Sequence, residues 1–281
     1  MPRMTILDEI RRLDPVADHQ RIVFLSACRE FPFDTTRALE FALFRTYCVP
    51  SISALLDHTG EFRARPQKRY DDTDILISEL MERGYDSERG TRALRKMNQL
   101  HGRFAIANDD FLYVLSTFIY EPIRWVDRFG WRPMCEHERL AYYYFWREVG
   151  RRMNIKDIPG NIEAFEHFNQ DYERRHFRFS ETNQRVGAAT RELFVGWFPR
   201  VLAPLTRSTI HAMLDDPLLD AFGFPRPSRF LRWLVPGSLR LRSRVVRFLP
   251  PRRLPRLRTE THHPSYPDGY TIEALGPPKS P

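Results

Sequence analysis

Apolar residues recur at intervals of three and four along nearly the whole chain, which is the spacing that places them on one face of an α-helix. No stretch alternates between apolar and polar residues for long enough to predict a β-sheet. Short connections rich in Gly, Pro and Asn separate the helical stretches, so we expect one all-α bundle. The predicted helices cover residues 4–12, 17–30, 35–47, 51–58, 65–83, 87–101, 108–130, 136–153, 161–176, 182–197 and 203–216, with helical pieces between 228 and 248.

The longest predicted helix, residues 108–130, carries signals at its start and in its interior. Asn108 is a favourable N-cap, and Asp109 and Asp110 suit the positive end of the helix dipole. Pro122 cannot donate a backbone hydrogen bond, so we expect it to bend the helix or to be accommodated by a neighbouring element.

The composition changes near residue 225. With 281 residues, of which 42% are hydrophobic, the chain is long enough for one large domain with a real core. The net charge is +8, yet residues 226–258 contain eleven Arg and no acidic residue, so the remainder is close to neutral. The last stretch, THHPSYPDGYTIEALGPPKSP, is rich in turn formers. We predict a single helical domain over 1–225 and an Arg/Pro-rich, basic C-terminal tail over 226–281.

The cysteines and the apolar stretches bear on the cellular compartment. Cys28, Cys48 and Cys135 match neither a metal-site spacing nor an even disulfide framework, so we interpret them as buried thiols of a reducing compartment. The N-terminus is charged where a signal peptide requires an apolar run. The longest nearly apolar stretch, FLYVLSTFIY at 111–120, is far shorter than the roughly 20 residues of a spanning helix. These features predict a cytoplasmic protein without a signal peptide or a transmembrane helix.

Histidines are the first candidates for chemistry, because Gly-rich phosphate loops, nucleophile elbows and H-E-x-x-H are absent from the sequence. His101 closes a helical stripe with Leu94, Met97 and Asn98 and should face the bundle interior. It is either a core histidine satisfied by a carbonyl group or a metal ligand. An imidazole in an apolar pocket is the usual proximal ligand of haem iron.

A second candidate is the segment EAFEHFNQDYERRHF, residues 163–177. Glu173 and His176 have the spacing used in di-iron carboxylate bundles. Such sites need two of these pairs plus further glutamates, and the sequence contains no second pair, so the match is weak. The other candidate ligands are Glu163, Glu166 and His167.

Two further stretches place polar or aromatic groups on a helix face that should be buried. AYYYFWREVGRRM, residues 141–153, has Trp146 and Gly150 on an aromatic stripe that either packs in the core or contacts a ligand. Gly150 lets either another helix or a flat ligand approach closely. RPQKRYDDTDILISEL, residues 65–80, has Arg69 and Thr73 four apart on a face that continues into Leu and Ile. Arg69 either lies at the helix edge with its head in water or points inward for a functional reason.

The Arg-rich part of the tail has an amphipathic pattern. Leu231, Leu234, Val235 and Leu239 share a helical face, and Trp233 lies beside them. A basic amphipathic segment with aromatic residues suits an anionic membrane surface, and a solvated tail is the alternative. No base-stacking platform or reading helix accompanies the charge, so we expect no specific nucleic-acid partner.

Four motifs together resemble the MpaB-type oxygenases, a family that shares its catalytic domain with latex clearing protein, the rubber oxygenase. The likeness covers most of residues 15–225 and, more thinly, the SYPDGY stretch, and it is stronger to the MpaB branch. The motifs are RPQKRYDDT, RKMNQLHGRFAIANDDFLYVLSTF, EPIRWVDRFGWRP and FWREVGRRMNIKDIP.

The resemblance implies a globin-like fold that holds haem b and an oxygenase that cleaves a C=C bond of an isoprenoid or other long apolar substrate with dioxygen. By position, His101 would be the iron ligand, and Arg69 and Thr73 would lie on the distal side. Asn108 and Trp146 fall on two further family segments around the cofactor. Arg69 would then point inward to stabilise charge on the reacting oxygen.

One position departs from the family pattern. Asp72 occupies the place of a distal lysine in the rubber oxygenases, where a carboxylate cannot cap iron and would repel an anionic oxygen unless Arg69 paired with it. Two other functions stay open at this point. One is a di-iron oxygenase built on residues 163–176, and the other is a membrane-associated protein that shelters a lipid without chemistry.

Overall fold

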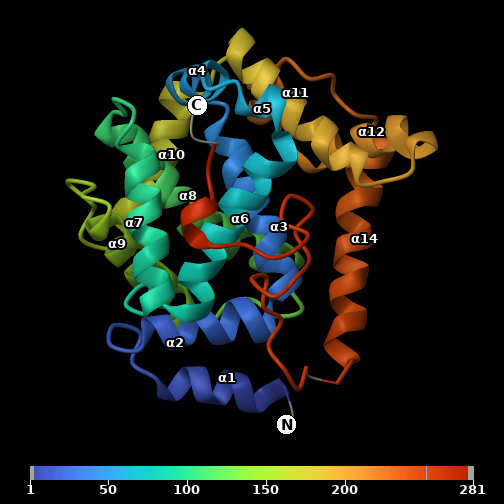
Figure 1. Ribbon diagram of the computed structural model, residues 1–281. Coiled ribbons are helices and arrows are strands. Elements are labelled where there is room, and N and C mark those ends of the chain that lie inside the picture. Colours follow the sequence, from blue (N-terminus) through green and yellow to red (C-terminus); the bar gives the residue numbers. More distant parts are fainter. Residues whose placement is uncertain (1–2, 251, 278–281) are drawn as a thin grey trace.

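The computed structural model describes residues 3–250 and 252–277, and in these ranges the chain is helical and has no β-strand (Figure 1). The prediction of an all-α fold is confirmed, and its likeness to the globin arrangement stays a prediction. The α-helices are α1 (Arg3–Arg12), α2 (His19–Phe24), α3 (Pro32–Thr46), α4 (Pro50–His58), α5 (Glu61–Ala64), α6 (Pro66–Arg83), α7 (Glu88–His101), α8 (Asn108–Phe129), α9 (Glu136–Arg152), α10 (Ile162–His176), α11 (Glu181–Gly196), α12 (Ala203–Met213), α13 (Asp216–Phe222) and α14 (Arg229–Phe248).

Most predicted helices coincide closely with the observed ones, and the differences have local causes. The predicted helix 17–30 is α2 continued by a π-helix over Leu25–Glu30. The predicted helix 203–216 ends early because Asp215 caps a new helix, α13, by accepting a hydrogen bond from the Leu218 amide. The pieces expected between 228 and 248 form one continuous helix, and the short α5 was not predicted.

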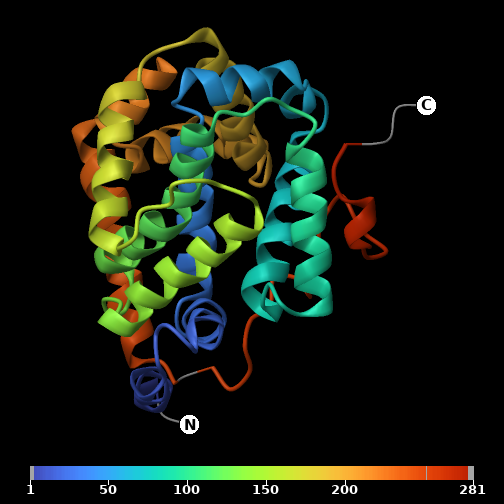
Figure 2. The same ribbon diagram turned by 90° about the vertical axis from the view of Figure 1, so that its left-hand side faces the viewer.

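The long helix α8 lies at the centre, packed against α3, α9 and α10. Pro122 lies inside α8 in a buried position, so the neighbouring helices accommodate it. The expected N-cap at Asn108 is wrong, because Ala107 occupies the cap position and Asn108 is the first helical residue. Figure 2 shows α6 and α7 side by side next to this centre, and together they carry most of the candidate site.

The C-terminal part of the chain returns to the bundle. α14 packs against α8 and α12 at one edge of the molecule, and residues 252–277, here named the C-terminal strap, cross in front of α6 (Figure 1). A short 3-10 helix in the strap, Ile272–Ala274, packs against α7. The division of the chain at residue 225 stays a prediction from composition.

Cys28 and Cys48 are buried as expected, while Cys135 is half-buried, and all three are free thiols. Among the described residues, no single helix is both long and apolar enough to cross a membrane. α3 and α4 reach that measure only as a pair, across a bend of 96°.

Candidate functional site

α6 places Arg69 and Thr73 on one face. Pro66 begins this helix, since its fixed φ suits the first turn and its missing N–H is not needed there. The Thr73 hydroxyl donates to the Arg69 carbonyl oxygen at 3.0 Å and accepts a hydrogen bond from the Arg69 guanidinium. The two side chains therefore form one hydrogen-bonded unit.

Arg69 and Thr73 line a small cavity of about 20 Å³ between α3, α5, α6 and α11. Apolar and aromatic groups supply most of its exposed wall, although six of the eleven lining side chains carry a polar group. The other lining residues are Glu40, Leu43, Tyr47, Phe62, Pro66, Tyr70, Thr190, Leu193 and Phe194. Arg69 thus points inward, which answers the question raised by its place on an apolar helix face.

The guanidinium of Arg69 has no carboxylate partner in the described part of the chain. It contacts the Thr73 hydroxyl and lies 5.6 Å from the centre of the Phe62 ring. Arg69 forms no ion pair with a described residue, although the Glu40 carboxyl lines the same cavity, so its cation can attract negative charge on a ligand or a reacting group. The same wall holds Tyr47, whose pKa burial raises to about 12 although the Arg69 charge acts in the opposite direction.

His101 is the last residue of α7 and is half-buried, with its ring edge-on to Phe111 at 5.4 Å between centroids. Its Nδ1 atom is buried and has no hydrogen-bond partner among the described residues. Burial and, to a lesser extent, the charge of Arg69 lower the pKa of His101 to about 4. The imidazole is therefore neutral near pH 7, which is the form that binds a metal ion. The charge of Arg69 acts on His101, although His101 is not among the side chains that line the cavity.

Asp72 does not line this cavity but binds the C-terminal strap. Its carboxylate accepts hydrogen bonds from Lys68 Nζ at 3.0 Å and from the Tyr266 hydroxyl. Lys68 also donates to the Gly276 carbonyl oxygen at 2.8 Å. Lys68 pairs with the Asp72 carboxylate, which lies outside the lining of the cavity, so the repulsion expected between Asp72 and a distal oxygen stays a prediction.

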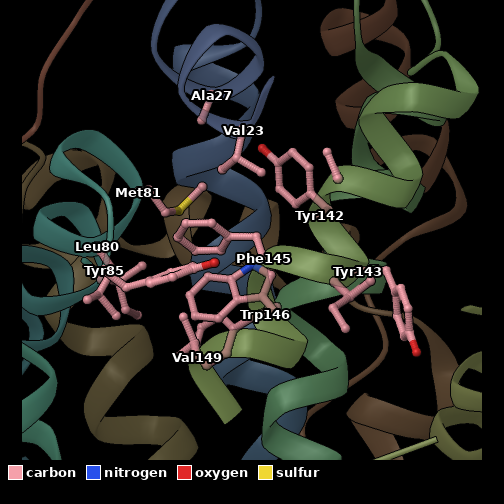
Figure 3. Close-up of a cluster of buried hydrophobic side chains, with 14 of the residues drawn as sticks. Val23, Ala27, Leu80, Met81, Tyr85, Tyr142, Tyr143, Phe145, Trp146 and Val149 are labelled. Carbon is pink, nitrogen blue, oxygen red and sulfur yellow. The ribbon is translucent and has the colours of Figure 1, made fainter. Parts of the chain in front are cut away.

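Trp146 lies in the packed core rather than at the cavity lined by Arg69. Figure 3 shows it among Leu80, Tyr85 and Val149, and its ring stacks on Phe118 with centroids 4.8 Å apart. Its indole Nε1 is buried without a hydrogen-bond partner among the described residues. Trp146 therefore packs in the core, which is the first of the two alternatives given for its aromatic stripe.

Gly150 has a packing reason of its own. A Cβ at this position would meet Leu115 Cδ2 at 2.4 Å and Ile158 Cδ1 at 2.9 Å. The glycine therefore allows α8 and the loop after α9 to approach α9, as the helix-packing alternative expected.

Asn108 fastens the start of α8 to the loop after α9. Its side-chain oxygen accepts from the Lys156 amide at 2.8 Å, and its side-chain nitrogen donates to the Lys156 carbonyl oxygen at 3.1 Å. The structure gives Asn108 this structural contact and does not place it at the cavity lined by Arg69.

The residues of the di-iron hypothesis do not converge. Glu173 accepts hydrogen bonds from Arg45 and Tyr113, and His176 stacks on Tyr172 at 4.1 Å between centroids. Glu166 pairs with an arginine of α8. In residues 3–250 and 252–277, no three side chains of His, Cys, Asp or Glu gather as a metal site. Arginine side chains pair with the Glu166 and Glu173 carboxylates.

Glu40 is a site residue that the sequence did not reveal. It is buried in the cavity wall, accepts a hydrogen bond from the Tyr70 hydroxyl at 2.6 Å and forms an ion pair with Arg37 at 2.7 Å. Burial raises the pKa of the Glu40 carboxyl to about 7. The available signal was an acidic residue inside the apolar run RALEFALF.

The donor chemistry of this region fits a haem group. His101 offers a neutral imidazole with an unsatisfied buried nitrogen, and Arg69 offers a cation free to pair with a negatively charged substituent. Cofactor sites in helical bundles are commonly built from side chains on facing helices, and α6 and α7, which carry Arg69 and His101, pack against each other.

An all-helical fold with a neutral imidazole and a guanidinium without an ion-pair partner among the described residues is a common scaffold for a cofactor site. The chain belongs to the family described as "ER-bound oxygenase mpaB/B'/Rubber oxygenase, catalytic domain", whose model matches residues 19–248.

Three named relatives come from Penicillium. The chain is 30% identical over 243 residues to ER-bound oxygenase mpaB' of Penicillium brevicompactum, covering 80% of this chain and 57% of that protein. It is 31% identical over 211 residues to ER-bound oxygenase mpaB of Penicillium roqueforti, covering 68% and 70%. It is 34% identical over 166 residues to ER-bound oxygenase mpaB of Penicillium brevicompactum, covering 52% and 42%. The chain thus spans little more than half the length of the first relative.

Proposed function

We propose that this protein is a haem-dependent oxygenase that cleaves a C=C bond of an isoprenoid or other long apolar substrate with dioxygen. Both atoms of one dioxygen molecule end on the two alkene carbons, the C–C bond breaks, and two carbonyl products form. This stoichiometry balances without an external reductant. The observation that carries the proposal is the neutral His101, with its unpartnered buried nitrogen, within the field of an unpaired Arg69.

His101 would hold the iron of haem b, since its low pKa keeps the imidazole available over the physiological range. Haem, when bound, supplies the redox chemistry that dioxygen needs and that no side chain can provide. The protein's own contribution is to orient the reactants and to exclude water from an apolar region.

Arg69 would stabilise negative charge that develops on oxygen during the reaction, because its guanidinium faces the cavity and forms no ion pair with a described carboxylate. Thr73 would fix the direction of that guanidinium through the hydrogen bond that joins the two side chains. The aromatic and aliphatic wall, including Phe62 and Phe194, suits an apolar hydrocarbon chain.

The proposal is tested by incubating the purified, haem-loaded protein with polyisoprenoid alcohols and prenylated aromatic compounds under ¹⁸O₂. We expect carbonyl products that carry one labelled oxygen on each fragment. Fragments that never carry the label, even at the earliest time points, would contradict dioxygen as the source of the oxygen, and hydroxylated substrates with an intact carbon chain would contradict C=C cleavage.

A further inference from the structure

α14 exposes an apolar stripe to solvent along its length. Six large apolar side chains on this helix are at least 40% exposed, with Trp233 at 72% and Phe248 at 85%. Their spacing of three, four and seven residues places them on one helix face. They are Phe230, Trp233, Leu234, Leu241, Val245 and Phe248.

The opposite face of α14 holds the helix to the bundle. Pro236 and Ser243 are buried, and Leu239 packs against the cluster that contains Trp125 and Phe129. Leu239 was expected to share an outward face with Leu234, and this is wrong because the two side chains lie on opposite sides of the helix. α14 carries apolar side chains on both sides, and only one of these sides packs against the bundle.

Four exposed arginines run beside the outward stripe. Each precedes an exposed apolar residue by one position, and none forms an ion pair with an acidic side chain of the described residues. They are Arg229, Arg240, Arg244 and Arg247. The arginines on the inward side differ, since Arg232 pairs with Asp216 at 2.5 Å and Arg242 pairs with Asp34 at 3.1 Å.

The start of the C-terminal strap also exposes arginines and an apolar side chain. Arg252 and Arg253 are exposed, and Leu254 is 78% exposed. The Arg29 guanidinium holds this backbone by donating to the carbonyl oxygens of Arg252 and Arg253 at 3.3 and 3.2 Å. The apolar and cationic surface therefore continues beyond the helix.

We propose that the outward face of α14 is a membrane-docking surface that lies in the interface of an anionic lipid bilayer. Exposed Trp and Phe enter the boundary between head groups and acyl chains, and the adjacent arginines meet anionic head groups. The inference does not depend on the oxygenase chemistry.

Charge and shape favour a lipid surface over two other occupants. A second copy docked by a two-fold axis would bring the same unpaired arginines together, and like charges oppose that contact. A nucleic acid would use the arginines but leaves no role for a continuous row of exposed Leu, Val and Phe side chains. An anionic bilayer offers an apolar environment to the row of apolar side chains and negative charge to the row of arginines.

The test is flotation of the full-length protein with phosphatidylcholine vesicles, with and without phosphatidylserine. We expect binding only when phosphatidylserine is present, at low salt, and release at high salt. The triple variant Arg240→Gln, Arg244→Gln, Arg247→Gln should bind on the order of 10²-fold more weakly, since each basic residue near such a surface contributes about fivefold. The double variant Trp233→Ala, Phe248→Ala should also lose binding, although both side chains are exposed and their removal leaves the fold intact.

The control removes the same charge elsewhere. Arg63, Arg95 and Arg178 are exposed on other elements, and their triple replacement by Gln should leave vesicle binding unchanged. Three results would overturn the proposal. They are a wild-type protein that stays with the soluble fraction at low salt, a control variant that weakens binding equally, and an apolar variant that binds normally. A concentration-dependent dimer in sedimentation that Trp233→Ala, Phe248→Ala abolishes would assign the face to a second copy instead.

Discussion

The Arg69 guanidinium donates a hydrogen bond to the Thr73 hydroxyl one turn further along α6, and both side chains line the same apolar cavity. The hydroxyl also donates to the Arg69 carbonyl oxygen at 3.0 Å, so its remaining lone pair faces the guanidinium. This pair directs a positive charge that no carboxylate of the described residues neutralises. We therefore expect the Arg69–Thr73 pair to affect the reaction more than the stability of the fold.

Arg69→Ala should lower the rate of C=C cleavage by a factor on the order of 10²–10³, because one preorganised charge stabiliser is lost. Thr73→Val keeps the side-chain shape and removes the acceptor, so it should reduce the rate less. Single-turnover kinetics per bound haem measures both effects, and the melting temperature should stay near the wild-type value. Arg63→Ala on α5 is the matched control. A variant at Arg69 that unfolds, yet reacts at the normal rate per folded molecule, would show that this arginine is structural.

Glu40 predicts a pH dependence of stability. Burial raises its pKa to about 7 in the folded state, so the folded protein holds this proton more tightly than the unfolded chain does. The associated stability is present below the unfolded pKa near 4.5 and is lost as pH rises through about 7, by up to about 3 kcal/mol. Urea unfolding of wild type and Glu40→Gln at pH 5 and pH 8 measures this loss in the free energy of unfolding.

The glutamine keeps an acceptor for the Tyr70 hydroxyl and cannot ionise, so its advantage over wild type should grow with pH. Glu163→Gln, at an exposed position, should show no such growth. Parallel pH profiles for wild type and Glu40→Gln would contradict the assignment.

The C-terminal strap should stabilise the helix that carries Arg69. Arg258 binds Asp74 on α6 through Nη2 at 2.5 Å and Nε at 3.1 Å, and the Asp74 side chain is only 13% exposed. Arg258→Gln leaves that carboxylate without its cation and should cost about 2–3 kcal/mol in the free energy of unfolding. The double variant with Asp74→Asn should recover most of the loss, and additive effects in this cycle would exclude coupling between the two residues.

Gly150→Ala should destabilise the protein by about 1–3 kcal/mol, because the new Cβ forces Leu115 and Ile158 to move in a packed core. Gly160→Ala is the control, since nothing lies within 4 Å of a Cβ there. Thermal unfolding measures both variants. Equal melting temperatures would mean that the contact at Gly150 relaxes freely.

Local patterns predicted much of the fold. Apolar spacing placed four helix starts within a residue or two, and in the structure the side chains of Ser87, Asn161, Ser180 and Ser228 cap these helices by accepting a hydrogen bond from an early amide. The face shared by Arg69 and Thr73 also followed from spacing alone, because a helix repeats every 3.6 residues whatever surrounds it.

Contacts between segments far apart in the chain could not be predicted from local sequence patterns. Asp72 accepts a hydrogen bond from Tyr266 across 194 positions, and no local signal indicates that contact, although the ion pair between Asp72 and Lys68 spans a single helical turn. α14 is apolar on both sides, so spacing could not tell that Leu239 faces the bundle and Trp233 faces solvent. Trp146 fell on a family segment, yet core packing and cofactor contact give the same aromatic stripe in a single sequence.

The absorption spectrum and iron content of the purified full-length protein test the central claim most directly. We predict a Soret band with one iron per chain, and loss of both in His101→Ala while the helical circular dichroism stays at the wild-type level. Two irons per chain without a Soret band would favour a di-iron oxygenase, and a metal-free protein that retains lipid would favour a carrier. Either result, or unchanged haem content in His101→Ala, would contradict the assignment of His101 as the iron ligand.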